Sequence, residues 1–251
     1  MGSTGRCFTW LLTQFFLVLA IAAVILWAQS AYGQAQLFRA DAQARSIDDA
    51  HSNRSFHLGG FFTGGFVPNY HLHYFGGSRT VELNIFNAGL SAGKVLTAAH
   101  GRGPFRGRLE ADVELMPFWV GDYPKQTQAL CIAGLGCGTS PWSPYRSYGM
   151  SVTPWLTRWN FVGGGTHRIL PWAELGGGLL WTNHKFPLLG GSTSVINFTP
   201  QVGIGQSLFV RKNRSLDFAF KAVHISNAGL GDNNPGLNVT LQFSAGYSWW
   251  K

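Results

Sequence analysis

The chain has 251 residues and a formal net charge of +8, yet only 12% of its residues are charged, while 45% are hydrophobic and 14% aromatic. So many aromatic residues and so few charges exclude an intrinsically disordered chain, and the scattered lysines and arginines argue against a nucleic-acid partner, which needs them on one helix or face. A chain that is rich in glycine and aromatic residues but poor in charge is typical of a membrane β-barrel, whose strands are apolar on one face only.

The N-terminus predicts export. A basic residue, Arg6, precedes an apolar run over residues 8–28, and small residues follow as far as Gly33. We interpret residues 1–33 as a secretory signal peptide cleaved after Gly33, because no basic stop-transfer cluster follows the run directly. The alternative is an uncleaved membrane anchor, since the run is long for a signal peptide. Residues 34–54 are polar and predict a short tail.

Residues 55–251 predict an all-β domain, because apolar and polar residues alternate between Gly, Pro and Asn clusters. In "RLEADVEL", residues 108–115, the apolar side chains take one face and four charged ones take the other. Inside a small barrel these charges would face inward and pair with each other; they are Arg108, Glu110, Asp112 and Glu114. The eight predicted strands lie near 55–67, 80–97, 107–120, 147–163, 168–182, 194–210, 214–226 and 236–250.

The lengths of the connections between strands indicate which β-architecture the chain adopts. Those after the second, fourth and sixth strands are short, and the others are longer, with residues 121–146 the longest. This alternation predicts an eight-stranded antiparallel up-and-down transmembrane barrel of the bacterial outer membrane, with short periplasmic turns and longer external loops. Side chains fill so narrow a barrel, so a transport channel is not expected. Interfacial girdles would account for several of the tryptophans, namely Trp119, Trp155, Trp159, Trp172, Trp181, Trp249 and Trp250.

Two cysteines, Cys131 and Cys137, bracket the short loop "CIAGLGC". In an exported protein such a pair predicts a disulfide that staples the loop. The spacing completes no zinc site, because no second ligand pair lies nearby.

The segment "HISNAGLGDNNPGLN", residues 224–238, carries the candidate chemistry. On the strand 214–226, His224 and Ser226 share the parity of the apolar side chains and therefore face the membrane. Residues two apart on one strand face lie about 6.7 Å apart, so the imidazole can act as general base for the hydroxyl. The alternative is that the two residues sit at the polar membrane boundary, where such side chains are tolerated.

This segment resembles the active site of the PagL-type lipid A 3-O-deacylases, which group with the acyloxyacyl-hydrolase-like barrels. The resemblance implies an eight-stranded outer-membrane barrel with an outward-facing serine esterase site. It implies Ser226 as nucleophile and His224 as base, with the Gly229 N–H and the Asn234 side chain stabilising the oxyanion. Asn227 would shape the site. The alternative for Asn227, Gly229 and Asn234 is turn chemistry, which uses the same residue types.

The sequence departs from the family at Asn238, where the family has a glutamate that orients and charges the histidine. An asparagine can orient a histidine but cannot stabilise the imidazolium with a charge. Strict alternation from Val239 also places Asn238 inward, so that it meets His224 only if a bulge resets the register. Asp232 is a weaker substitute for the acid, and Asp217 faces the wrong way.

Three functions follow from these residues. The first is an outer-membrane esterase that removes the ester-linked 3-O-acyl chain of lipid A or lipopolysaccharide. The second is a non-catalytic barrel of the same fold with a decayed site, which Asn238 favours. The third is an acyltransferase using the same serine. A serine mechanism requires no metal or cofactor, the partners are lipid A and outer-membrane lipids, and a homodimer is one option for the assembly.

Overall fold

The computed structural model describes residues 55–251, except for 68–69, 75–76, 125, 133–135, 163–167, 187–193 and 231–236. The predicted signal peptide and polar tail lie outside the described residues. No helix in the described part of the chain is long and apolar enough to cross a membrane.

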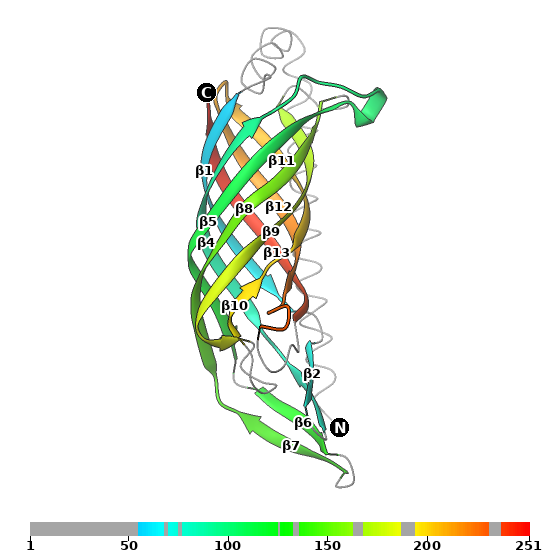
Figure 1. The fold of residues 1–251 in the computed structure, drawn as a ribbon, viewed down its shortest axis with the longest axis vertical. Helices are drawn as coiled ribbons and strands as arrows, with labels where there is room; N and C mark the ends of the chain where they lie inside the picture. The colour runs from blue at the N-terminus through cyan, green and yellow to red at the C-terminus, as the bar shows by residue number, and fades with distance from the viewer. Residues whose placement is uncertain are drawn as a thin grey trace, which may run out of the picture. The chain divides into compact units, whose positions relative to one another are not determined.

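The described strands close into an antiparallel barrel (Figure 1). Around the wall, β1 is followed by β4, β5, β8 and β9, then by β10 and β11, which together make one strand, and then by β12 and β13. The ring is completed because β13 pairs with β1. This confirms the eight-stranded barrel and every predicted strand position. The strands are β1 (Phe56–Phe66), β4 (Asn84–Val95), β5 (Gly107–Tyr123), β8 (Tyr145–Phe161), β9 (Ile169–Phe186), β10 (Ser194–Phe198), β11 (Gln201–Arg211), β12 (Arg214–Ile225) and β13 (Leu237–Trp250).

Pro200 interrupts the sixth strand of the wall. It separates β10 from β11, because proline has no N–H to donate to a neighbouring strand. Phe198 pairs with Leu179 and Gln201 with Gly176 on β9, so the register is the same on both sides of the interruption. The predicted strand 194–210 is therefore a single strand of the wall with a local break.

The alternation predicted for residues 108–115 is confirmed, and other strands of the barrel also supply partners for its charges. Glu110, Asp112 and Glu114 are buried in the lumen, whereas Val113 and Leu115 are exposed on the outer wall. The carboxylates of these three residues have partners on other strands. They contact cations on three other strands: Glu110 and Asp112 contact His57 of β1, Asp112 also contacts Arg158 of β8, and Glu114 contacts Lys221 of β12.

Among the described residues, one group has potential ligand atoms close enough together to hold a metal ion: His57, Glu110 and Asp112. The His57 Nε2 atom lies 2.8 Å from Glu110 Oε1 and 3.1 Å from Asp112 Oδ1. The second Asp112 oxygen lies 3.3 Å from the Arg158 guanidinium, and Asn160 donates to the second Glu110 oxygen at 2.6 Å. These contacts engage the carboxylate oxygens within the protein, so the group is an ion-pair cluster of the lumen.

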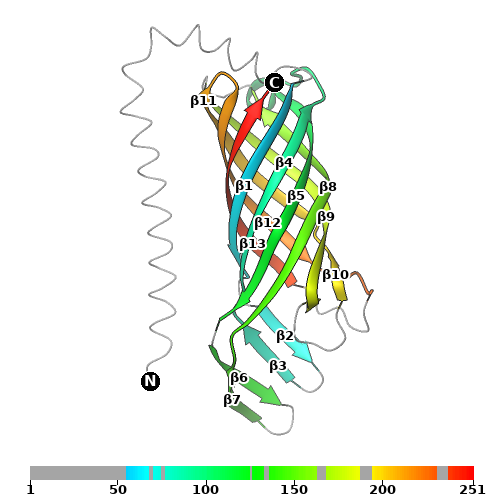
Figure 2. The ribbon, with the colours of Figure 1, turned by 90° about the vertical axis from the view of Figure 1, so that its left-hand side faces the viewer.

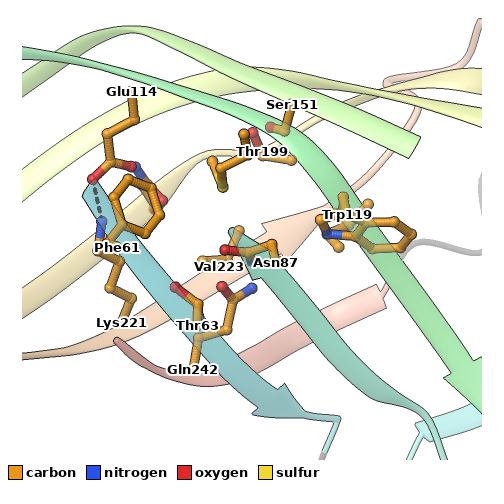
Figure 3. A pocket seen from close by; sticks show the side chains of 13 residues that line it. Phe61, Thr63, Asn87, Glu114, Trp119, Ser151, Thr199, Lys221, Val223 and Gln242 are labelled. Carbon is orange, nitrogen blue, oxygen red and sulfur yellow. Dashed lines mark hydrogen bonds and ion pairs between the residues drawn. The ribbon is translucent and has the colours of Figure 1, made fainter. Parts of the chain in front are cut away.

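Side chains fill the lumen, as predicted for a barrel of this width. An apolar cluster that includes Ile85, Trp119 and Phe186 lies at one end, and a second with Phe209 and Trp250 lies at the other. Between them are polar and charged side chains around cavities of about 20 and 40 Å³. Figure 3 shows the first cavity, with Lys221 bonded to Glu114 beside it. Such polar cavities have room for individual water molecules.

The tryptophans divide between the two faces of the wall. Trp155, Trp181 and Trp249 are exposed on the outer surface, as interfacial girdles require. Trp119, Trp172 and Trp250 are buried instead, and Trp159 packs edge-on against His100. In the lumen Trp172 lies under the Arg158 guanidinium and Trp250 against the His57 ring. The girdle prediction is therefore wrong for the three buried tryptophans and stays a prediction for the exposed ones.

Both longest connections contain strands. Between β1 and β4 lie β2 (Tyr70–Tyr74) and β3 (Gly77–Val81), and between β5 and β8 lie β6 (Gln126–Ile132) and β7 (Gly136–Trp142). Together they form a second, four-stranded sheet (Figure 2). The segment expected as a loop at 121–146 is thus mostly β-structure. The register places Cys131 directly opposite Cys137 in the β6–β7 hairpin, and the disulfide between them stays a prediction.

At the opposite end of the barrel the chain turns at 96–106, 162–168 and 212–213. The first of these turns is longer than expected, because β4 ends at Val95 and the short helix η1 (Gly103–Phe105) follows. Since β1 begins and β13 ends at this same end, we refer to it as the turn end. Outer-membrane barrels keep their short turns on the periplasmic side, so the two inserted hairpins and the end of β12 at Ile225 lie on the external side.

Candidate active site

The His224–Ser226 pair lies on the outer wall at the external end of β12. Residues 215, 219, 221, 223 and 225 of this strand are buried in the lumen, and Phe220 is 48% exposed on the other face. His224 and Ser226 share the parity of Phe220 and are half-buried. The strand therefore presents both side chains on the lipid-facing side, at the external rim of the barrel.

The broken strand β10–β11 holds the backbone of the pair. The His224 N–H donates to the Pro200 carbonyl at 3.0 Å. Ser226 and Phe198 exchange two backbone hydrogen bonds, of 3.1 and 2.6 Å. The two candidate residues are thus attached to the wall on this side, although β12 itself ends at Ile225. Sequence reasoning had not singled out Pro200 or Phe198, because strand pairing is not visible in a single sequence.

A tight turn follows Ser226 and is organised by Asn227. The Asn227 side chain is buried, and its Oδ1 accepts a hydrogen bond of 3.0 Å from the Gly229 N–H. The Asn227 carbonyl accepts from the Leu230 N–H at 2.9 Å. This arrangement supports the site-shaping role that the resemblance implies for Asn227. It also means that the Gly229 N–H, the implied oxyanion donor, is engaged with Asn227 in this conformation.

Ala228 has a left-handed backbone conformation, with φ of 50°, and Gly229 follows with φ of 84°. Glycine adopts this region freely, whereas an alanine there costs about 1–2 kcal/mol. The Ala228 N–H lies 3.2 Å from Ser226 Oγ and donates to it. The strained residue thus directs a backbone donor at the candidate nucleophile, and strain of this kind is commonly found at functional sites.

Asn238 lies next to His224 because the register of β12 and β13 shifts there. Val223 pairs with Thr240, but Ile225 pairs with Leu237. His224 is therefore opposite two residues of β13, Asn238 and Val239. A bulge of this kind offsets the alternation of the bulged strand by one residue. The register shift is the kind of reset that a meeting of Asn238 and His224 requires, and the contact between them stays a prediction.

The remaining predicted site residues divide into two groups. Asn234 and Asp232 lie outside the described residues. Asp217 points into the lumen, as expected, where it accepts hydrogen bonds from Ser215 at 3.0 Å and Ser248 at 2.6 Å. It therefore cannot orient His224, which is on the other face of the same strand.

Apolar side chains surround the pair on the wall. Phe198 and Ile196 of the neighbouring strand are exposed, as is Val239 opposite His224. Farther around the wall Trp181 pairs with Ile196 and is also exposed. A hydroxyl and an imidazole within such a surface can reach an acyl chain lying beside the barrel, whereas a substrate inside the lumen could not reach them.

The chain was compared with known sequences and solved structures. No curated protein matches the sequence. The outer membrane enzyme PagL shares 18% identity, with 76% of this chain and 98% of that one covered and a TM-score of 0.43. OprG from Pseudomonas aeruginosa shares 13%, covering 80% and 97%, with a TM-score of 0.45. Ail of Yersinia pestis shares 8%, covering 80% and 100%, with a TM-score of 0.40.

The amino-acid sequence itself matches a protein family. Residues 112–248 match the family described as "Lipid A 3-O-deacylase (PagL)". The matched segment begins within β5 and contains all barrel strands after it except the last residues of β13. It includes His224, Ser226 and Asn238. This chain, an antiparallel β-barrel of the outer membrane, belongs to the PagL lipid A 3-O-deacylase family.

Proposed function

We propose that this chain is an outer-membrane esterase that hydrolyses the ester bond of the 3-O-linked acyl chain of lipid A. The observation that carries the proposal is the position of His224 and Ser226 on the lipid-facing side of β12, at the external rim. Lipid A acyl chains occupy the membrane beside that wall, so the scissile ester would lie at the level of the pair. Membership of the PagL family supports the substrate class and the bond.

The proposed reaction has two steps. The Ser226 Oγ attacks the ester carbonyl while the His224 imidazole takes the hydroxyl proton, and the resulting tetrahedral oxyanion collapses to an acyl-serine. The proton passes from His224 to the sugar oxygen, which leaves as an alcohol. Water, deprotonated by His224, then attacks the acyl-serine, and the fatty acid and free Ser226 are released.

The oxyanion would be stabilised by the Gly229 N–H and the Asn234 side chain, as the resemblance implies. For Gly229 to do so, Asn227 Oδ1 must release its N–H. The Ala228 N–H already lies 3.2 Å from Ser226 Oγ, so it is a further donor close to the reacting atoms. One such donor typically contributes ~10²–10³ in rate.

Asn238 takes the position of the orienting acid in this proposal. Its place opposite His224 supports a role in holding the imidazole, without the charge that a glutamate would add. This substitution favours a second candidate function, a non-catalytic barrel of the same fold. The acyltransferase remains a third candidate, since it differs only in whether an alcohol or water accepts the acyl group, and the homodimer stays a prediction.

The test is deacylation of lipid A by the purified protein in detergent, followed by mass spectrometry. We expect the loss of one 3-O-linked hydroxyacyl chain as free fatty acid, abolished in Ser226→Ala. The matched control is Ser207→Ala, because Ser207 is buried in the lumen and should leave the activity unchanged. Equal activity in the wild type and Ser226→Ala would remove Ser226 from the mechanism. Activity that appears only in Asn238→Glu would favour the non-catalytic barrel.

A further inference from the structure

The exposed cations of the barrel gather at its turn end. The sequence shows them scattered, because they lie in connections far apart along the chain. The structure brings these connections together, since the turns 96–106, 162–168 and 212–213 and the end of β13 are at one end of the barrel (Figures 1 and 2). We call this set the basic end; its exposed members are Arg102, Arg106, Arg168, Arg211, Lys212 and Lys251.

In the part of the chain that the structure describes, no exposed acidic side chain lies at the turn end. The nearest carboxylates along these strands, Glu110 and Asp217, face the lumen and are engaged there. The external end differs. Its exposed cations include Arg146, which is paired with Asp122 at 2.7 Å, and Lys185, and Glu82 is exposed at the same end. The surface charge of the described barrel is therefore strongly asymmetric along its axis.

Exposed apolar and aromatic side chains are interleaved with these cations. Phe105, which is 74% exposed, lies between Arg102 and Arg106 in the same connection. On the wall just inside the turns, Arg214 pairs with the exposed Trp249 and its guanidinium donates to the Tyr247 hydroxyl at 3.2 Å. Aromatic rings at strand ends occupy the headgroup level of a bilayer, and long basic side chains extend from there toward the lipid phosphates.

We infer that the basic end binds the headgroups of anionic glycerophospholipids in the membrane leaflet at the turn end. A ring of guanidinium and ammonium groups around a barrel that is embedded by its apolar wall can meet phosphodiesters on every side. The interleaved aromatic residues favour a bilayer over a soluble acidic macromolecule, which would need a continuous basic face outside the membrane. The attraction is electrostatic, so it should weaken as added salt shortens the screening length. This inference does not depend on the proposed esterase activity.

The experiment measures lipid selectivity with the full chain reconstituted in phosphatidylcholine vesicles. Spin-labelled phosphatidylglycerol or spin-labelled phosphatidylcholine is added, and the fraction of each label immobilised at the protein surface is compared. We expect the wild type to select phosphatidylglycerol by roughly fivefold at low ionic strength. The selectivity should fall toward unity at about 0.5 M NaCl, where the screening length is a few ångströms.

Two variants of the basic end test the assignment separately: Arg102→Gln with Arg106→Gln, and Arg211→Gln with Lys212→Gln. Each should lose part of the selectivity, and their combination most of it. The matched control is Arg146→Gln with Lys185→Gln at the external end, which should keep the wild-type value. Heat-modifiable migration on SDS gels reports that each variant forms a folded barrel. Absence of selectivity in the wild type, or an equal loss in the external-end control, would overturn the inference.

Discussion

His224 on β12 lies opposite Asn238 on β13, at the position where the pairing of the two strands shifts by one residue. Without the shift, the alternation of β13 would set Asn238 on the other face of the wall. With it, the residue that departs from the family pattern occupies the register position of a histidine partner.

We therefore expect Asn238→Glu to accelerate lipid A deacylation. A carboxylate stabilises the imidazolium that forms when His224 takes the Ser226 proton, and the reverse change in serine proteases lowers kcat by about 10⁴. The increase in kcat should be roughly 10²-fold or more, while Asn238→Ala should be slower than the wild type. Initial rates of fatty acid release in detergent measure both. A folded Asn238→Glu that is no faster than the wild type would show that residue 238 does not act on His224.

Asn227→Ala should lower kcat by about tenfold, or more, without unfolding the barrel. The substitution loosens the turn that keeps Ala228 strained and directs its N–H at Ser226 Oγ, and this loss should outweigh the release of the Gly229 N–H from Asn227. Asn227→Ser is the matched variant, because a serine hydroxyl makes the same local bond more weakly, and it should retain an intermediate kcat. If the alanine and serine variants have equal rates, the hydrogen bond at 3.0 Å does not position the site.

Gly93→Ala should prevent the barrel from reaching its normal stability. A Cβ at Gly93 would overlap the Asp112 carboxylate and the His57 ring, both of which are buried. Gly64→Ala is the matched control, because a Cβ at that position meets no atom within 4 Å. We expect the urea midpoint of unfolding in detergent to fall clearly for Gly93→Ala and to change little for Gly64→Ala. Equal midpoints would mean that the cluster around His57 rearranges at no cost.

Lys221→Met should destabilise the barrel by about 3–5 kcal/mol, because it leaves two buried carboxylates without their shared cation. The Lys221 ammonium lies 2.7 Å from Glu114 and 2.9 Å from Glu174. The control is Arg146→Gln, which breaks a solvent-exposed pair with Asp122 and should leave the free energy of unfolding unchanged within error. Equilibrium unfolding in urea measures both. Unchanged stability in Lys221→Met would show that the lumen carboxylates are neutral or hydrated.

The eight strands of the wall could be predicted because their pattern is local. In residues 108–115 and 194–210 each side chain alternates between lipid and lumen, and a period of two can be recognised in any short window. The outward position of His224 and Ser226 follows from the same rule applied to β12. It needed no knowledge of which strands are neighbours.

The contacts across the barrel could not be predicted in this way. The partners His57 and Arg158, which come from β1 and β8, had no signal in the sequence around Glu110 and Asp112. The Trp119 and Trp250 side chains were candidates for the membrane interface and instead seal the ends of the lumen. In both cases the contacts of the side chains depend on which residues meet inside a closed sheet.

The sequence alone determined the class of fold, the faces of its strands and the candidate nucleophile and base, since alternation and a short motif act over a few residues. Only the tertiary structure decided that Asn238 lies opposite His224, that the Ala228 N–H reaches Ser226, and that distant cations form one basic end. Those relationships depend on strand register and closure of the barrel, which are set by hydrogen bonds between segments far apart in the chain.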